Sequence, residues 1–246
     1  MSSTFFSSCE SCRWKAVLKQ YERVLETKAE KSRKRQEMVY LDNWFQKELP
    51  SIILQRDPKH VTRDELIRLM EWKLTRGKFR PRLSQLVKEN SEELVVEVST
   101  NALKKAAVDL KAAIIDLTRL KAVGPATASA VLCAGAPDVA PFLADESAAA
   151  VSGLNKVEYT LPYYLEYAKT VCDKAEDLKK QDPEYGWNAH KVELSLWTFK
   201  TANQLGFDIK EQEGTTEDRR KRKHTDDRSP KAAKRKVVCP NLETDT

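Results

Sequence analysis

Apolar residues recur every three or four positions through most of the chain, which is the spacing of an amphipathic helix. One such stripe predicts a helix over 102–117, formed by Leu103, Ala106, Leu110, Ala113, Ile114 and Leu117. The same spacing predicts helices from Arg13, over 158–180 and from Asn188, and Thr62-Arg-Asp-Glu65 is a capping-box pattern that opens another. Only seven glycines occur in 246 residues. Because β-sheets need many tight turns, the pattern predicts an all-α fold.

Changes in this pattern divide the chain into four predicted segments. Residues 1–12 are rich in serine and are predicted to be disordered, and 13–58 is predicted to be an N-terminal helical segment. Residues 59–207 hold most of the periodic apolar positions and are predicted to form the main helical domain. Apolar residues become sparse beyond Phe207, so 208–246 is predicted to be a disordered basic tail.

The basic charge of the chain is concentrated in this tail. The net charge is +6, from 43 basic and 37 acidic residues, and the stretch 219–236 alone carries +8. Two clusters separated by ten residues resemble a bipartite nuclear-import signal, namely Arg219, Arg220, Lys221, Arg222 and Lys223, then Lys234, Arg235 and Lys236. We therefore expect a location in the nucleus and a nuclear import receptor as a partner. A non-specific nucleic-acid tail is the alternative, and both roles can hold at once.

The cysteines and the apolar runs bear on metal and membrane binding. Five cysteines at irregular spacing favour reduced thiols inside the cell. Cys9 and Cys12 resemble half of a zinc site, but no second pair follows at ligand spacing, so no metal and no cofactor is predicted. The first residues do not form a signal-peptide pattern, and no run approaches the roughly 18 apolar residues of a membrane span. We expect no membrane partner, and the pattern does not indicate an oligomeric state.

The segment from Leu117 to Leu132 predicts two helices joined by a tight turn. Pro125 suits the first position of the second helix, since its missing N–H would be unpaired there, and Gly124 suits a turn whose backbone must approach a partner closely. The small residues that follow leave amide hydrogens uncovered, and such a helix terminus binds anions. We predict contacts to DNA phosphates at Val123, Gly124, Ala126 and Thr127.

This segment resembles the helix-hairpin-helix superfamily of base-excision DNA glycosylases. Their motif is Leu-x-Gly-Val-Gly-x-x-x-Ala, followed at a set spacing by a catalytic Asp, and the chain matches it through Leu120, Val123, Gly124, Ala128, Val131 and Leu132. Asp145 falls at the spacing of the catalytic Asp, and the likeness covers about 35 residues. The resemblance implies a glycosylase-like helical domain over 59–207 with a helix-hairpin-helix at 117–135. It also implies DNA as a partner and Asp145 as the candidate catalytic residue.

The chain departs from the family's pattern at three points. Ala122 replaces the first hairpin glycine, and Ala126 stands where lyase members have their Schiff-base lysine. The cysteine cluster that binds iron–sulfur in some members is missing after the motif. The resemblance therefore leaves only a monofunctional glycosylase, in which Asp145 stabilises an oxocarbenium-like sugar or activates water. Asp145 also suits the alternative role of capping the helix that follows it.

A second basic stretch lies well before the hairpin. Arg76, Lys78, Arg80 and Arg82 place a positive charge at every second position. In an extended segment these side chains would point to one face and suit a phosphate backbone, whereas the alternative is a solvated loop. Phe79, within this run, is interpreted as a core anchor, with a base-stacking group as the alternative.

The sequence supports three hypotheses about function. The first is a nuclear DNA-binding protein with a glycosylase-like helical fold, without lyase activity and with catalysis left open. The second, from the enzyme class, is a monofunctional base-excision DNA glycosylase that uses Asp145. The third is a helical protein-interaction module that has kept the fold and lost DNA binding.

Overall fold

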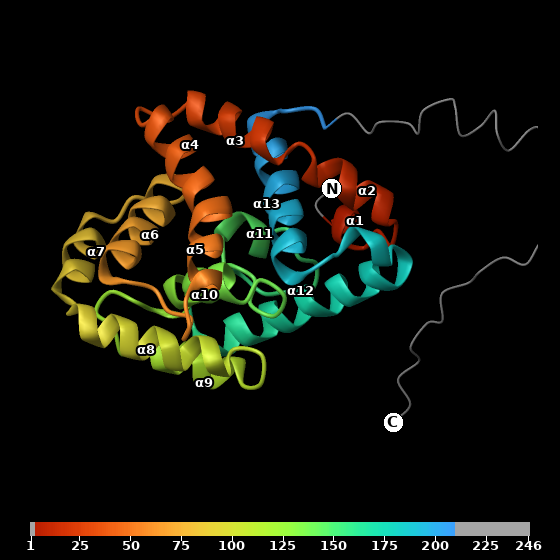
Figure 1. The fold of residues 1–246 in the computed structure, drawn as a ribbon. Helices are drawn as coiled ribbons and strands as arrows, with labels where there is room; N and C mark the ends of the chain where they lie inside the picture. Colours follow the sequence, from red (N-terminus) through yellow and green to blue (C-terminus); the bar gives the residue numbers. More distant parts are fainter. Residues whose placement is uncertain (1–2, 210–246) are drawn as a thin grey trace, which may run out of the picture. The chain divides into compact units, whose positions relative to one another are not determined.

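The computed structural model describes residues 3–209, and every regular element in this range is helical, as predicted (Figure 1). Residues 1–2 and 210–246 lie outside the described residues, and with them all but the first two residues of the predicted disordered tail (208–246) and both basic clusters of the import signal. The α-helices are α1 (Ser3–Phe6), α2 (Ser11–Leu18), α3 (Tyr21–Glu30), α4 (Arg35–Asn43), α5 (Leu49–Gln55), α6 (Arg63–Arg76), α7 (Pro81–Leu86), α8 (Glu92–Lys105), α9 (Leu110–Leu117), α10 (Pro125–Gly135), α11 (Asp145–Ala148), α12 (Leu161–Gln181) and α13 (Ala189–Leu205). One π-helical segment joins α4 to α5, and short 3₁₀ turns follow α7 and α12 (Trp44–Glu48, Val87–Glu89 and Pro183–Tyr185).

Several helices begin at residues whose side chains accept a hydrogen bond from the first turn. Thr62 and Glu65 form the predicted capping box of α6, in which the Glu65 amide donates to the Thr62 hydroxyl at 3.2 Å and the Thr62 amide donates to the Glu65 carboxylate at 2.9 Å. Asn188 caps α13 as predicted, because its side-chain oxygen accepts from the Lys191 amide at 2.9 Å.

The single helix predicted over 102–117 is wrong, since the structure divides this stretch between α8 and α9. The break comes at Asp109, whose carboxylate accepts a hydrogen bond from the Ala112 amide at 2.9 Å and so caps α9. Helix α8 begins at Glu92, after a cap by Ser91. The two helices pack directly against each other.

The prediction that residues 1–12 are disordered is wrong for the described part of that range. Helices α1 and α2 cover much of it, and Phe5 is only 1% exposed. The Phe5 ring stacks on Phe199 of α13 at 4.5 Å between centroids and tilts against Trp14 at 4.4 Å. These apolar contacts remove the rings from water and order the N-terminal segment.

The boundary predicted near residue 58 does not separate two domains. Helices α2 and α3 pack on α13, and α5 packs on α10, so the N-terminal segment belongs to the same core as the rest. The described residues fall in one compact unit, Met1–Glu211.

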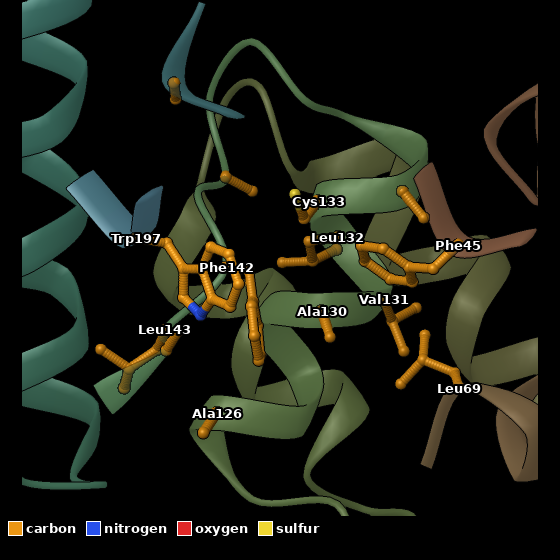
Figure 2. Packing of buried hydrophobic residues seen from close by; sticks show 14 of the residues in the cluster. Phe45, Leu69, Ala126, Ala130, Val131, Leu132, Cys133, Phe142, Leu143 and Trp197 are labelled. Atoms are coloured by element: carbon orange, nitrogen blue, oxygen red, sulfur yellow. The ribbon is translucent and has the colours of Figure 1, made fainter. Parts of the chain in front are cut away.

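Helix α10 runs through the interior of this unit. Every residue from Ala126 to Ala134 is buried, and α10 packs against α5, α6, α8, α9 and α12 (Figure 1). Its short side chains let several helices approach closely at once. Figure 2 shows Phe45 and Leu69 beside one side of α10, and Phe142 and Trp197 beside the other. The turn that opens α10 is therefore fixed to the core of the molecule.

Candidate nucleic-acid-binding cleft

A cleft of about 800 Å³ opens at the N-terminal end of α10. Most of its lining comes from the end of α6 with the loop after it, the turn before α10, and residues between Phe142 and Tyr159. Helices α3, α7 and α13 add one or two residues each. Six of the lining side chains are basic and two are acidic, namely Lys28, Lys73, Arg76, Lys78, Arg80 and Lys156, then Asp145 and Glu146. The cleft therefore carries an excess of positive charge, which favours an anionic ligand.

The turn between α9 and α10 is held by a buried side chain from elsewhere in the chain. Asn90 is 4% exposed, its side-chain oxygen accepts from the Lys121 amide at 2.8 Å, and its side-chain NH₂ donates to the Lys121 carbonyl at 3.1 Å. The next residue, Ala122, has a φ of +65°, in the left-handed region that favours glycine. The turn thus has the backbone conformation of a glycine position, although alanine occupies it.

Two of the four hairpin residues predicted to bind phosphate use their amides within the hairpin itself. The Val123 amide donates to the Leu120 carbonyl at 3.2 Å, and the Thr127 amide donates to the Gly124 carbonyl at 2.9 Å. Within residues 3–209, no hydrogen bond occupies the amides of Gly124 and Ala126. Of the four predicted residues, these two therefore keep an amide that could donate to a ligand.

The fold does not require a glycine at position 124. Its φ of −96° and ψ of −177° form an extended conformation that any residue adopts, and a Cβ added there would meet nothing within 4 Å. A side chain would instead project into open space beside the free amides. Neither backbone conformation nor internal packing therefore requires glycine at this position.

Asp145 lies in the cleft and pairs with two groups there. Its carboxylate accepts a hydrogen bond from the Tyr159 hydroxyl at 2.6 Å and forms an ion pair with Lys78 at 3.0 Å. Burial raises the pKa of Asp145, but Tyr159 and Lys78 outweigh it and hold the pKa below its ordinary value, so the side chain is a carboxylate at neutral pH. The alternative of Asp145 as a helix cap is wrong, because Ala144 occupies the N-cap position of α11.

The structure does not bring the four predicted cations of the basic run to one face. Lys78 and Arg80 are exposed and line the cleft, and Arg82 is exposed on α7 outside its lining. Arg76 is in the last turn of α6 and only 3% exposed, so it is not available to a phosphate at the surface. The run is not extended throughout, because its two ends belong to helices α6 and α7.

Arg76 occupies a buried aromatic box under the cleft. Its guanidinium carbon lies 4.2 Å from the ring centroid of Trp197 and 5.3 Å from that of Trp72, with Tyr21 and Phe142 each at 5.8 Å. Its nearest carboxylate is Asp42, with 3.8 Å between Nε and Oδ1. Cation–π attraction and this ion pair compensate for part of the cost of removing the charge from water.

Two further ionisable groups lie close to this box. Glu193 is fully buried, and burial raises its pKa to about 7 even though the Arg76 guanidinium acts to lower it. Burial and the same guanidinium lower the pKa of His190 to about 4, so the imidazole is neutral. The His190 ring nitrogens lie 2.7 Å from the Gln46 side-chain oxygen and 3.0 Å from the Cys133 sulfur. His190 Nδ1 also lies 3.9 Å from the Glu193 carboxylate, so the two ionisable groups adjoin each other.

Some cleft residues had no signal in the sequence. Lys156 and Tyr159 lie on the loop before α12, where no motif or periodic pattern marks them. Arg76 had a signal that could have been used, since it follows Trp72 by four positions and so continues the apolar stripe of α6. An arginine on such a stripe faces the interior.

Neither comparison with known proteins nor a search for metal sites and membrane spans assigns a further role to the described residues. Comparison with models of protein families, with curated proteins and with solved structures found no match. Within residues 3–209, no group of three or more His, Cys, Asp or Glu side chains could hold a metal ion. No helix in that part of the chain combines the length and apolar character needed to cross a membrane.

Proposed function

We propose that this chain is a nuclear DNA-binding protein with a glycosylase-like helical fold. One observation carries the proposal: the hairpin turn and Asp145, the two features that resemble the glycosylase motif, line the same positively charged cleft. They are about 20 residues apart in sequence, and most of the basic residues of the cleft come from elsewhere. A shared surface of this kind suits a DNA backbone.

In this proposal, backbone amides and basic side chains would contact different phosphates. The amides of Gly124 and Ala126 would donate to one phosphate at the N-terminus of α10, where the helix dipole also favours an anion. Lys78, Arg80 and Lys156 are exposed at the cleft and would neutralise neighbouring phosphates. None of these contacts reads a base, so we expect binding that is largely independent of sequence.

The salt dependence of DNA binding tests this proposal. Replacing one lysine that contacts a phosphate should weaken binding to all duplexes alike and reduce the slope of log affinity against log salt by about 1. We expect this for Lys78→Ala in a fluorescence anisotropy titration. Lys169→Ala is the matched control, because Lys169 is similarly exposed and also paired with an aspartate, Asp173, but does not line the cleft. Equal slopes for both variants and the wild type would argue against binding at the cleft.

A monofunctional DNA glycosylase is the second candidate, and the state of Asp145 favours it. An ionised carboxylate inside a cleft that binds DNA could stabilise an oxocarbenium-like sugar as a base departs. The cleft, at about 800 Å³, has room for a base rotated out of the duplex. Incubation of the protein with duplexes that carry single damaged bases tests this. Excision that Asp145→Asn abolishes while DNA binding persists would establish the enzyme, and no excision by the wild type would leave a binding protein.

The proposed nuclear location rests on the two basic clusters at 219–223 and 234–236, which lie outside the described residues. Alanine replacement of both clusters in a fluorescent fusion should move the protein out of the nucleus. Unchanged nuclear accumulation would remove the import receptor from the proposed partners.

A further inference from the structure

Phe79 is a large apolar side chain that the fold leaves in water. It lies in the loop between α6 and α7 and is 69% exposed, whereas the other phenylalanines of the described residues are buried or half-buried. The prediction of a core anchor at this position is therefore wrong. Burial of a phenylalanine stabilises a fold, and most of that gain is absent here. Internal packing therefore does not explain why a phenylalanine occupies position 79.

The surroundings of Phe79 are cationic rather than apolar. Its two sequence neighbours, Lys78 and Arg80, are exposed and line the cleft. The Arg80 guanidinium carbon lies 5.8 Å from the ring centroid of Tyr159, an aromatic residue that lines the cleft and is 43% exposed. Exposed aromatic rings interleaved with cations are typical of surfaces on which nucleic-acid bases stack while the backbone is held electrostatically. An apolar protein partner would require a contiguous apolar patch, and the charges on either side of Phe79 interrupt one.

We propose that Phe79 stacks on a DNA base at the rim of the cleft, and that the protein consequently prefers DNA with an unpaired nucleotide over a perfect duplex. This inference rests on the proposed function, because it needs DNA at the cleft. Inserting a ring into an intact duplex requires bases to unstack, which costs free energy at each step. An unpaired nucleotide has already lost part of its stacking, so the ring gains most there. Phe79 thereby determines specificity for DNA structure, while the basic residues supply affinity.

The test compares two labelled duplexes that are identical except for one unpaired nucleotide, titrated with the full chain in a fluorescence anisotropy assay. We expect the wild type to bind the duplex with the unpaired nucleotide about tenfold more tightly, in line with the range for one base–aromatic stack. Phe79→Ala should remove most of that preference, and Phe79→Trp should keep it because the indole also stacks. The basic tail contacts both duplexes alike, so its contribution cancels in the ratio.

Tyr40→Ala is the matched control. Tyr40 is 61% exposed and has the Arg68 guanidinium carbon 4.9 Å from its ring centroid. Neither of its sequence neighbours lines the cleft, whereas both neighbours of Phe79, Lys78 and Arg80, do. We expect this variant to keep the wild-type preference. Because Phe79 is exposed, its replacement leaves the core intact, and the salt slope should not change.

The outcomes separate this inference from the proposed function. No binding to either duplex overturns both. Binding with a normal salt slope but no preference in the wild type, or a preference that survives in Phe79→Ala, overturns the role of Phe79 alone. An equal loss of preference in Tyr40→Ala would also overturn it, because the effect would then not belong to the cleft.

Discussion

At the scale of single residues, Ala122 holds a backbone conformation that its side chain makes costly. Its φ of +65° lies in the left-handed region, where a Cβ atom costs roughly 1–2 kcal/mol. We expect Ala122→Gly to raise the free energy of unfolding by about 0.5–1 kcal/mol, because glycine relieves this strain but has more entropy to lose. Urea denaturation measures the change.

Ala149→Gly is the control for this prediction. Ala149 is exposed and has an ordinary φ of −71°, so glycine there should lower stability. A loss of stability in Ala122→Gly as well would contradict the left-handed turn.

Glu193 should make the stability of the protein depend on pH, because its pKa is raised from an ordinary 4.5 to about 7. The folded state then takes up a proton at a higher pH than the unfolded state, so this residue's contribution to stability falls as pH rises from about 4.5 to about 7. Glu193→Gln stays neutral throughout. Relative to the wild type, we expect the variant to gain about 3 kcal/mol of stability between about pH 4.5 and about pH 8.

Urea denaturation of both proteins across this pH range tests the Glu193 prediction. Comparison with the wild type isolates Glu193 from His190, whose lowered pKa makes stability rise with pH over a similar range. A stability difference that is constant with pH would show that Glu193 is ionised in the folded protein.

At the scale of elements, the α9–α10 turn depends on Asn90. Asn90→Ala would leave the Lys121 amide and carbonyl without their partner, and a lost buried hydrogen-bonding group costs about 1–3 kcal/mol. We expect lower stability, together with weaker DNA binding at an unchanged salt slope, since no charge is altered. Asn203→Ala, at an exposed site on α13, is the control. Full DNA affinity in Asn90→Ala would mean that the turn does not need this support to bind.

The sequence predicted element type better than element ends or exposure. The capping box at Thr62 and the cap at Asn188 were predictable because a local hydrogen bond fixes each. The break between α8 and α9 was not, because Ala106 and Leu110 continue the apolar stripe across it while Asp109 alone provides the new cap. Periodicity records which face of a helix is apolar, and it is insensitive to a short interruption that preserves the face.

At the scale of the whole molecule, the cleft arises from tertiary packing that no local pattern contains. The hairpin and Asp145 could be proposed from the sequence because a known motif links them, and they share one cleft. Lys156 and Tyr159 join them only because the loop before α12 returns to the same place. Burial of Phe5 against α13 likewise depends on residues almost 200 positions away. The serine-rich composition of the first residues therefore does not reveal that this segment is ordered.

The central claim is that the cleft, and not only the basic tail, holds DNA. The most direct measurement is the DNA affinity, as a function of salt, of a chain that ends at Glu211, which keeps the whole compact unit and lacks both basic clusters. We predict binding at low salt that weakens as salt rises, and a loss of at least about tenfold in Gly124→Val. Valine suits the extended backbone there and its Cβ meets nothing within 4 Å, so we expect stability to be unchanged. No affinity in the shortened chain, or equal affinity in the variant, would contradict the claim.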